Sequence, residues 1–284
     1  MRIIEYVHKD KICDVKSVLK NKLNMSLSLI KKLKETGGIE RDGKVLRTVD
    51  LLNFQDRVKI TVPYNESDIL PVEHPIKIVY EDDDVICIQK DRGVPSHPSL
   101  DHHTDTLANF ALSYLNKSKD EFHIVTRLDS LTSGIVLAAK NQYSASVMCT
   151  KEYNKAIEKK YLGICRGIFD KKEGIVEVPI GRCEDSIIKR CVSDDGKHSK
   201  TGYSIEKDNG TDSIVSFKLY TGSTHQIRVH MAHINHPLRN DFLYDKNADD
   251  SEKFCLHCSE ISFVHPYSKE TVTVSSSLPD YFIL

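Results

Sequence analysis

The chain has 284 residues, with 40 lysines and arginines against 41 aspartates and glutamates, and 39% of its residues are hydrophobic. This composition excludes collagenous, low-complexity and disordered chains, and the length, at roughly 150 residues per domain, predicts two domains or one domain with an appendage. No run of about 18 apolar residues is present, so we expect no membrane span, and the charged N-terminal stretch does not resemble a secretory signal. The eight cysteines are scattered, which predicts reduced thiols in a cytoplasmic protein.

The net charge of -1 hides an uneven distribution along the chain. Residues 1–62 contain 14 basic and 8 acidic side chains, whereas residues 63–284 contain 26 and 33. A basic segment is expected where a protein contacts nucleic acid, because lysine and arginine neutralise phosphates. Solvated lysine-rich helix faces give the same count, so charge alone leaves both interpretations open.

The first 62 residues predict a small unit of two helices, a hairpin and a strand. The predicted elements are a helix over residues 14–23, a helix over residues 29–33 behind Ser26 or Ser28, a hairpin about Asp42-Gly43 and a strand over residues 58–62. Pro63, Pro71 and Pro75 then mark a linker.

The remaining residues alternate short strand patterns with a few helices. Strand patterns cover residues 85–88, 135–139, 175–180, 215–219 and 271–274. Helical spacing covers residues 107–115, behind Thr104 and Asp105, and residues 227–234, behind Thr224. Many short strands with few helices predict an α+β fold, in which a mixed, largely antiparallel sheet is flanked by helices and loops.

The stretch VTRLDSLTSGIVLAAKN combines a carboxylate with turn-forming residues ahead of an apolar strand. Asp129 stands two residues after Arg127 and is followed by Ser130, Thr132 and Gly134. Such a loop presents a carboxylate at the edge of a sheet. The same residues are typical of an ordinary turn, in which the aspartate accepts backbone N–H groups, so the spacing alone leaves the role of Asp129 open.

Within this stretch, TRLDSLTSG resembles the signature of the RluA-type pseudouridine synthases, which usually reads HRLD, two variable residues and TSG. Four further segments resemble family motifs in the same order, namely QKDRGVPSHPS, KKYLGICRG, TGSTHQIRVHMAHINHPLRND and LHCSEISFVHP. Three positions depart from the pattern: Thr126 replaces a histidine, Asp91 a proline and Ser223 an arginine. We expect Thr126 and Ser223 to alter the affinity for RNA and the choice of substrate more than the catalysed reaction.

The resemblance implies isomerisation of specific uridines to pseudouridine in structured RNA, either ribosomal or transfer RNA. This reaction detaches uracil from ribose through nitrogen and rejoins it through carbon 5, so it demands no metal and no cofactor. What it demands is a carboxylate beside the glycosidic bond. Whether that carboxylate attacks the ribose, attacks the base or assists formation of a glycal stays open.

The same resemblance assigns roles to individual residues. It implies Asp129 as the catalytic carboxylate and Arg228 as the cation that pairs with it, because a buried carboxylate otherwise tends to protonate. It implies that Tyr161 faces the uracil and that Arg127 fills the space left when the base is flipped out. Without the motifs, an exposed helix arginine and a core tyrosine are the alternative interpretations. The remaining residues expected to bind substrate are Thr132, His225 and Gln226.

The layout of the N-terminal segment and its phrase GGIERDGKVLRTVDLLNFQDRVKI resemble the small RNA-binding domain named after ribosomal small-subunit protein four. The resemblance implies a small α/β RNA-binding domain over residues 1–62, a linker over residues 63–75 and a pseudouridine synthase catalytic domain over residues 76–284. Where that family usually has arginine after the serine that opens its second helix, Leu29 follows Ser28, so we expect part of the phosphate contact to be missing.

Two other classes of function are alternatives to this one. The spacing of the C-terminal histidines and cysteines argues against a metal site; these residues are His225, His230, His233, His236, Cys255, Cys258 and His265. A catalytically silent RNA-binding or RNA-folding protein on the same scaffold is the stronger alternative, and release of the hydrogen at carbon 5 of uridine distinguishes it. No heptad pattern or long apolar stripe predicts an obligate partner, so we expect a monomer that binds RNA and no membrane.

Overall fold

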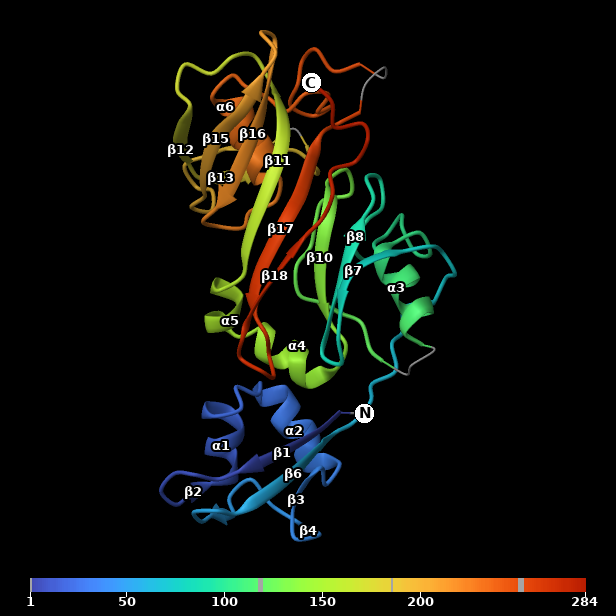
Figure 1. Ribbon diagram of the computed structural model, residues 1–284, viewed down its shortest axis with the longest axis vertical. Helices are drawn as coiled ribbons and strands as arrows, with labels where there is room; N and C mark the ends of the chain where they lie inside the picture. Colours follow the sequence, from blue (N-terminus) through green and yellow to red (C-terminus); the bar gives the residue numbers. More distant parts are fainter. Residues whose placement is uncertain (1, 117–119, 185, 250–252) are drawn as a thin grey trace.

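The structure is a computed structural model and describes residues 2–116, 120–184, 186–249 and 253–284. Residues 2–62 form a small sheet with two helices, and most of the remaining described chain is built around a larger sheet (Figure 1). Among the described residues no helix is both long enough and apolar enough to cross a bilayer.

The small sheet has the strand order β1-β6-β3-β4 and carries α1 and α2 on the side that faces the rest of the molecule (Figure 1). The elements are β1 (Arg2–Val7), β2 (Cys13–Asp14), α1 (Val15–Asn21), α2 (Leu27–Glu35), β3 (Ile39–Arg41), β4 (Lys44–Val45), β5 (Leu51–Leu52) and β6 (Arg57–Val62). The predicted helices, hairpin and final strand are confirmed, and Ser26 is the cap of α2. Strand β1 was not predicted; it pairs antiparallel with β6 along its whole length.

The large sheet has ten strands, eight of them in the order β12-β15-β16-β11-β17-β10-β8-β7. Strand β18 pairs with β17, and β9 with β10. The strands are β7 (Lys77–Glu81), β8 (Val85–Lys90), β9 (His123–Ile124), β10 (Ser133–Ala139), β11 (Glu158–Arg166), β12 (Glu173–Glu177), β15 (Lys200–Asp208), β16 (Asp212–Leu219), β17 (Leu256–Val264) and β18 (Thr271–Ser275). Every recorded pairing in this sheet is antiparallel except β10 with β17. The predicted α+β fold with a mixed, largely antiparallel sheet is therefore confirmed.

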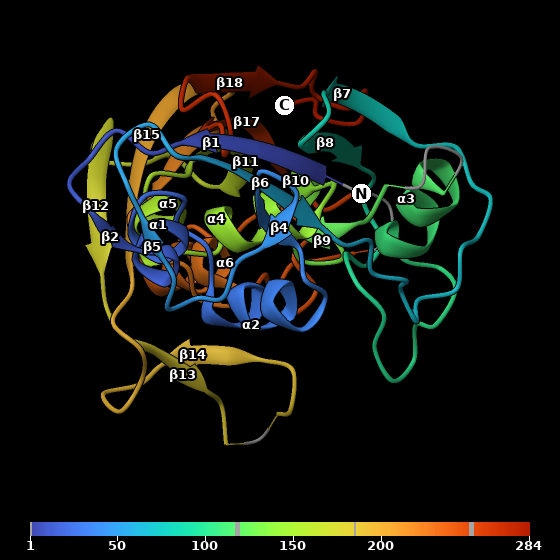
Figure 2. The same ribbon diagram turned by 90° about the horizontal axis from the view of Figure 1, so that it is seen from below.

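Three predicted boundaries are wrong for local reasons. The helix expected behind Thr224 has His225 as its cap residue, and the His225 side chain makes no capping hydrogen bond to the described residues. The apolar run over residues 175–180 is two strands, because β12 ends at Glu177 and the chain then turns through Pro179 into β13 (Ile180–Arg182). Strand β13 pairs with β14 (Arg190–Val192), and Figure 2 shows this hairpin projecting from the body of the molecule. Helix α3 (Leu107–Leu115) is capped by Thr106, not by Thr104 or Asp105, since Thr106 and Asn109 form a reciprocal capping box.

The described part of the large unit has three further helices: α4 (Gln142–Met148), α5 (Lys151–Lys155) and α6 (Gln226–His233). Helices α3 and α6 contribute to the same apolar core, which also contains Ile86 and Val136 from the centre of the sheet. Together they cover one face of the sheet. Tyr143 and Val147 of α4 instead belong to the core of the N-terminal unit.

Polar contacts reinforce the junction between the two units. Arg2 lies on β1, and its guanidinium donates to the buried carboxylate of Asp84 at 2.7 Å. Asp84 also accepts from Asn141 and Ser144, while the backbone N–H of Ser26 donates to Ser146 Oγ at 2.6 Å. Apolar packing and these hydrogen bonds therefore hold α2 and β1 against the large unit.

Candidate active site

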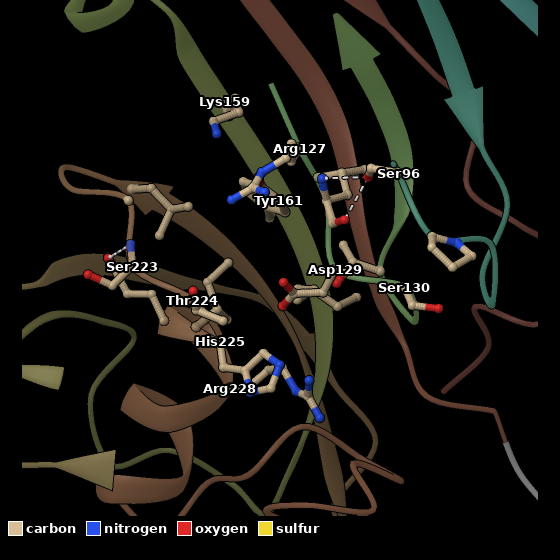
Figure 3. Close-up of a pocket in the computed structure, with 18 of the residues that line it drawn as sticks. Ser96, Arg127, Asp129, Ser130, Lys159, Tyr161, Ser223, Thr224, His225 and Arg228 are labelled. Atoms are coloured by element: carbon tan, nitrogen blue, oxygen red, sulfur yellow. Dashed lines mark hydrogen bonds between the residues drawn. The ribbon is translucent and has the colours of Figure 1, made fainter. Parts of the chain in front are cut away.

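A cavity of about 570 Å³ opens beside the junction of β10, β11 and β17. Its walls come from segments far apart in the chain: residues 95–99, residues 127–132, the start of β11, residues 222–228 and the start of β17. Figure 3 shows Asp129 in the middle of these side chains, with Tyr161 and Arg127 on one side and His225 and Arg228 on the other.

The loop that carries Asp129 is fixed by hydrogen bonds to residues 93–96. Ser96 Oγ donates to the carbonyl of Leu128 at 2.8 Å and accepts from its N–H at 3.2 Å (Figure 3). On the other side of Asp129, the Gly93 N–H donates to the Ser130 carbonyl at 2.8 Å, and Ser130 Oγ donates to the Gly93 carbonyl. Both neighbours of the carboxylate are therefore tied to one segment.

Lys90, at the end of β8, forms hydrogen bonds to the same loop. Its side chain is almost fully buried, and its ammonium donates to the carbonyls of Asp91, Val94 and Ser130 at 2.7–2.9 Å. Burial lowers the pKa of Lys90 to about 7, although the negative charges of Asp129 and Asp91 act in the opposite direction and raise it. Three carbonyl acceptors match the three N–H donors of the protonated form, so these contacts favour the ammonium.

Gly134 allows the sheet to close directly behind this loop. It has φ +113°, and a Cβ at this position would lie 2.3 Å from the Cys258 carbonyl oxygen. Only glycine permits this approach, which forms the parallel pairing of Ser133 and Gly134 with His257 and Cys258. The requirement explains why a glycine follows the loop sequence.

The Asp129 carboxylate acts electrostatically on the groups around it. Burial has the largest effect on the pKa of three neighbours: it raises that of Tyr161 and lowers those of His225 and Arg228. The negative charge of Asp129 raises the pKa of all three. For Tyr161 the combined result is a pKa well above the ordinary value, so its hydroxyl remains protonated. Tyr161 is buried, on β11 at a shift in register against β17.

Arg228 does not form the expected ion pair with Asp129. Its Nε and Nη2 donate to the two oxygens of Asp241 at 2.7 and 2.6 Å, and both side chains are buried. Burial lowers the pKa of Arg228, but the hydrogen bonds and charge of Asp241, followed by the charge of Asp129, raise it above its ordinary value. The guanidinium is also stacked near the rings of Phe242, Tyr244 and Phe254, at 5.1–5.9 Å. Arg228 is thus a fixed cation that lines the cavity without a direct bond to Asp129.

Gln226 also lines the cavity, where its side-chain amide bonds to the protein itself. The oxygen of its side-chain amide accepts from Thr221 Oγ1 and the Ser223 N–H, and its nitrogen donates to the Lys200 carbonyl and Thr201 Oγ1. These four bonds use both donors and both acceptor positions of the amide. Gln226 therefore shapes the cavity wall and has no hydrogen-bonding capacity left for substrate.

The other predicted binding residues all line the cavity. His225 is the cap residue immediately before α6, with φ +58°. Thr132 is buried and its N–H donates to the Asp129 carbonyl, whereas Arg127 is exposed. Figure 3 shows Arg127 near Lys159, a half-buried cation that no sequence motif indicates. Arg127 and Lys159 give this side of the cavity a positive charge.

The three departures from the motifs have different structural settings. Thr126 is buried and its Oγ1 accepts from the Leu137 N–H, so it braces β10 and does not line the cavity. Asp91 contributes its carbonyl to Lys90. Ser223 lines the cavity wall, where its hydroxyl pairs with Ser199 Oγ at 2.8 Å. Of the three, Ser223 is the one positioned to affect a bound nucleotide.

The histidines weighed as metal ligands have separate partners. His225 contacts the Tyr244 hydroxyl, His230 contacts Thr201 and the Val178 carbonyl, and His236 contacts the Arg166 carbonyl. Within the described ranges, no three histidine, cysteine, aspartate or glutamate side chains gather in a geometry that could hold a metal ion.

Comparisons with known proteins show the family to which the chain belongs. Residues 84–233, which contain Asp129, Tyr161 and Arg228, match the family model for RNA pseudouridylate synthase. The chain belongs to this family. It is therefore an RNA pseudouridine synthase, an isomerase that modifies RNA, and the RluA-type motifs fit this assignment.

Several relatives resemble the synthase along most of its length. An RNA pseudouridine synthase of Bacillus subtilis, YjbO, is 34% identical over 90% of this chain and 93% of its own. Ribosomal large subunit pseudouridine synthase D of Buchnera aphidicola is 36% identical over 78% of this chain and 76% of its own. The solved structure of human RNA pseudouridylate synthase domain containing 1 covers 74% of the synthase and 85% of its own chain, with a TM-score of 0.61 and 26% identity.

The structure also adds residues that motif comparison missed. Asp241 holds Arg228, Lys90 holds the Asp129 loop, and Tyr244 contacts His225. Asp241 stands at the end of the motif segment HPLRND, but nothing in its spacing connects it with Arg228. Only the fold of residues 234–241 brings the carboxylate back to α6.

Proposed function

We propose that Asp129 is the catalytic carboxylate with which the synthase converts uridine to pseudouridine. The observation that carries this proposal is the convergence of Asp129, Tyr161 and Arg228 on one cavity from three separate segments. A carboxylate in this setting acts on the ribose or the base at the glycosidic bond, either as a nucleophile or by stabilising positive charge and moving a proton.

We propose that the neighbours of Asp129 each have a separate role in catalysis or in binding the flipped nucleotide. Arg228, held rigid by Asp241, supplies a fixed positive charge that favours the ionised carboxylate. The protonated hydroxyl and apolar ring of Tyr161 face the uracil, where the ring stacks on the base. Arg127, exposed at the mouth of the cavity, enters the space that the flipped nucleotide leaves, since unstacking a base costs a few kcal/mol and needs compensation.

We propose that residues 1–62 form an RNA-binding domain joined through residues 63–75 to the catalytic domain over residues 76–284. The excess of basic residues and the resemblance to the domain of ribosomal small-subunit protein four support this role. Lys20 on α1 and Lys34 on α2 are exposed. Leu29, which stands where that family has arginine, is buried in the core of the unit, so packing replaces that phosphate contact.

We propose ribosomal RNA as the substrate, on the strength of two relatives that are named ribosomal large subunit pseudouridine synthase D. Transfer RNA is the other substrate class that the motifs allow. We further propose that the synthase works as a monomer in the cytoplasm, which light scattering of the purified protein and cell fractionation test directly.

The decisive experiment measures tritium released from carbon 5 of labelled uridine in ribosomal and transfer RNA. We expect release by the wild type from ribosomal RNA and none by Asp129→Asn, which keeps the size of the side chain but not its charge. RNA binding by Asp129→Asn should stay within about twofold of wild type, because the charged contacts to phosphates remain. Folded wild type that binds both RNAs without release would instead identify a silent RNA-binding protein.

The role of the N-terminal unit has its own test. The double variant Lys20→Glu/Lys34→Glu should raise the KM for RNA about tenfold or more at low salt, because two phosphate contacts become repulsive, with kcat unchanged. An unchanged KM, in a variant whose unfolding midpoint equals that of the wild type, would exclude these two lysines from RNA binding.

A further inference from the structure

Tyr244 lies behind the cavity wall and contacts three elements of the site at once. Its hydroxyl accepts a hydrogen bond from the backbone N–H of Arg190, on β14, at 2.9 Å, and lies 3.0 Å from His225 Nδ1. The two rings meet edge-on, with an interplanar angle of 85°. The face of the Tyr244 ring lies 5.1 Å from the guanidinium of Arg228. This one side chain therefore joins the projecting β13–β14 hairpin to His225 and Arg228 at the head of α6.

The hydrogen bonds of Tyr244 favour one position for the proton of the His225 imidazole. Tyr244 keeps its own proton at neutral pH, because burial raises its pKa to about 12. The Arg190 N–H already donates to its oxygen, so the phenol proton needs an acceptor. Among the residues that the structure describes, the recorded one is His225 Nδ1. A phenol that donates to Nδ1 leaves the neutral imidazole protonated at Nε2.

We propose that Tyr244 is a positioning residue that fixes His225 in the Nε2–H tautomer, so that the imidazole donates a hydrogen bond into the cavity to an acceptor oxygen of the target uridine. His225 lines the cavity, and no hydrogen bond of its Nε2 is recorded within the described part of the chain. Figure 3 shows its ring beside Arg228, on the side of the cavity that Asp129 faces. This inference rests on the proposed function, because it assigns the donor that meets the nucleotide on which Asp129 acts.

The backbone conformation of His225 indicates that surrounding contacts fix the orientation of this residue. A non-glycine residue at φ +58° occupies the left-handed region, which is disfavoured for L-residues and persists where surrounding contacts require it. The next residue supplies such contacts, because the four hydrogen bonds of Gln226 anchor the start of α6. Gln226 thus fixes the backbone of His225, and Tyr244 fixes its ring.

Nitrogen NMR of protein labelled with ¹⁵N-histidine tests the tautomer without reference to activity. The His225 signals are assigned by their loss in His225→Gln. In the wild type at neutral pH we expect an unprotonated Nδ1 and a protonated Nε2, and in Tyr244→Phe a mixture of tautomers. A wild-type Nδ1 that carries the proton, or an identical spectrum in Tyr244→Phe, overturns the proposal.

Tritium release supplies the functional readout. Tyr244→Phe keeps the ring beside Arg228 but lacks the hydroxyl, so we expect kcat to fall about tenfold with KM within about twofold, as for loss of one positioned hydrogen bond. Tyr114→Phe is the matched control, since it also removes a hydroxyl with a recorded hydrogen bond, to Glu81 on the opposite side of the large unit, and should leave kcat unchanged.

Two substitutions of His225 separate a donor at Nε2 from one at Nδ1. The amide nitrogen of glutamine reaches close to the position of Nε2, and that of asparagine close to Nδ1. We expect His225→Gln to retain more turnover than His225→Asn, and Tyr244→Phe to cause no further loss in the His225→Gln background. The reverse order of the two variants contradicts the proposal. Wild type that releases no tritium refutes the proposed function, whereas active wild type with the wrong tautomer refutes only this inference.

Discussion

The pair of Arg228 and Asp241 predicts that one substitution damages stability and catalysis for separable reasons. The two side chains are only 4% and 0% exposed, and two hydrogen bonds of 2.6 and 2.7 Å join them. Arg228→Leu leaves the Asp241 carboxylate buried with one remaining recorded hydrogen bond, from the Leu243 N–H at 3.1 Å. Breaking a buried pair on one side costs about 3–5 kcal/mol of unfolding free energy. For a chain of this size this corresponds to a fall in Tm of roughly 6–20 °C.

The double variant Arg228→Leu/Asp241→Asn should restore most of that stability. Without the charge on residue 241 no buried ion lacks a partner, and the asparagine oxygen can still accept from Leu243, so we expect unfolding free energy within about 2 kcal/mol of wild type. Turnover should remain lower by a factor of about 10²–10³ in both variants, since neither has the fixed cation beside Asp129.

Chemical denaturation and tritium release measure the two effects on the same samples. Arg47→Leu is the control for stability, because the Arg47 side chain is 79% exposed and its ion pair with Asp50 should contribute less than about 1 kcal/mol. If Arg228→Leu is as stable as wild type, the ion pair has no structural role. If the double variant turns over uridine at nearly the wild-type rate, Arg228 has no catalytic role.

Three further predictions follow from buried groups around the site. Lys90→Met should lower unfolding free energy by about 2 kcal/mol and reduce kcat, because three carbonyls lose their donor and the Asp129 loop loosens; equal Tm and kcat would contradict this. Gly134→Ala should cost about 3 kcal/mol or more, measured by urea denaturation, since its Cβ would collide with the Cys258 carbonyl; a stable alanine variant would exclude the close approach. Burial, with a smaller contribution from the Lys77 charge, lowers the pKa of His257 to about 4. As pH falls from 6.5 to 4, His257 therefore binds a proton in the unfolded chain before it does so in the folded chain, and this difference destabilises the fold. Wild type should lose about 3 kcal/mol more than His257→Gln over that range, and parallel stability curves would refute the assignment.

Several features of this protein follow from local sequence alone. The apolar spacing, Ser26 and Asp42-Gly43 predicted α1, α2 and the first hairpin, because caps, turns and helical faces depend on residues within a few positions of one another. The family motifs likewise predicted a site containing Asp129, Tyr161 and Arg228. These residues do line one cavity.

Partners that are distant in the chain were decided only by the tertiary structure. The pairing of β1 with β6, the contact of Lys90 with Ser130 and the bonding of Arg228 to Asp241 instead of Asp129 all depend on how the segments meet in space. The sequence supplied the charged groups of the site. The tertiary structure decides which opposite charge or acceptor each of these groups contacts. A buried ionised side chain is stable only next to such a partner, and the partner can come from any segment that the fold brings close.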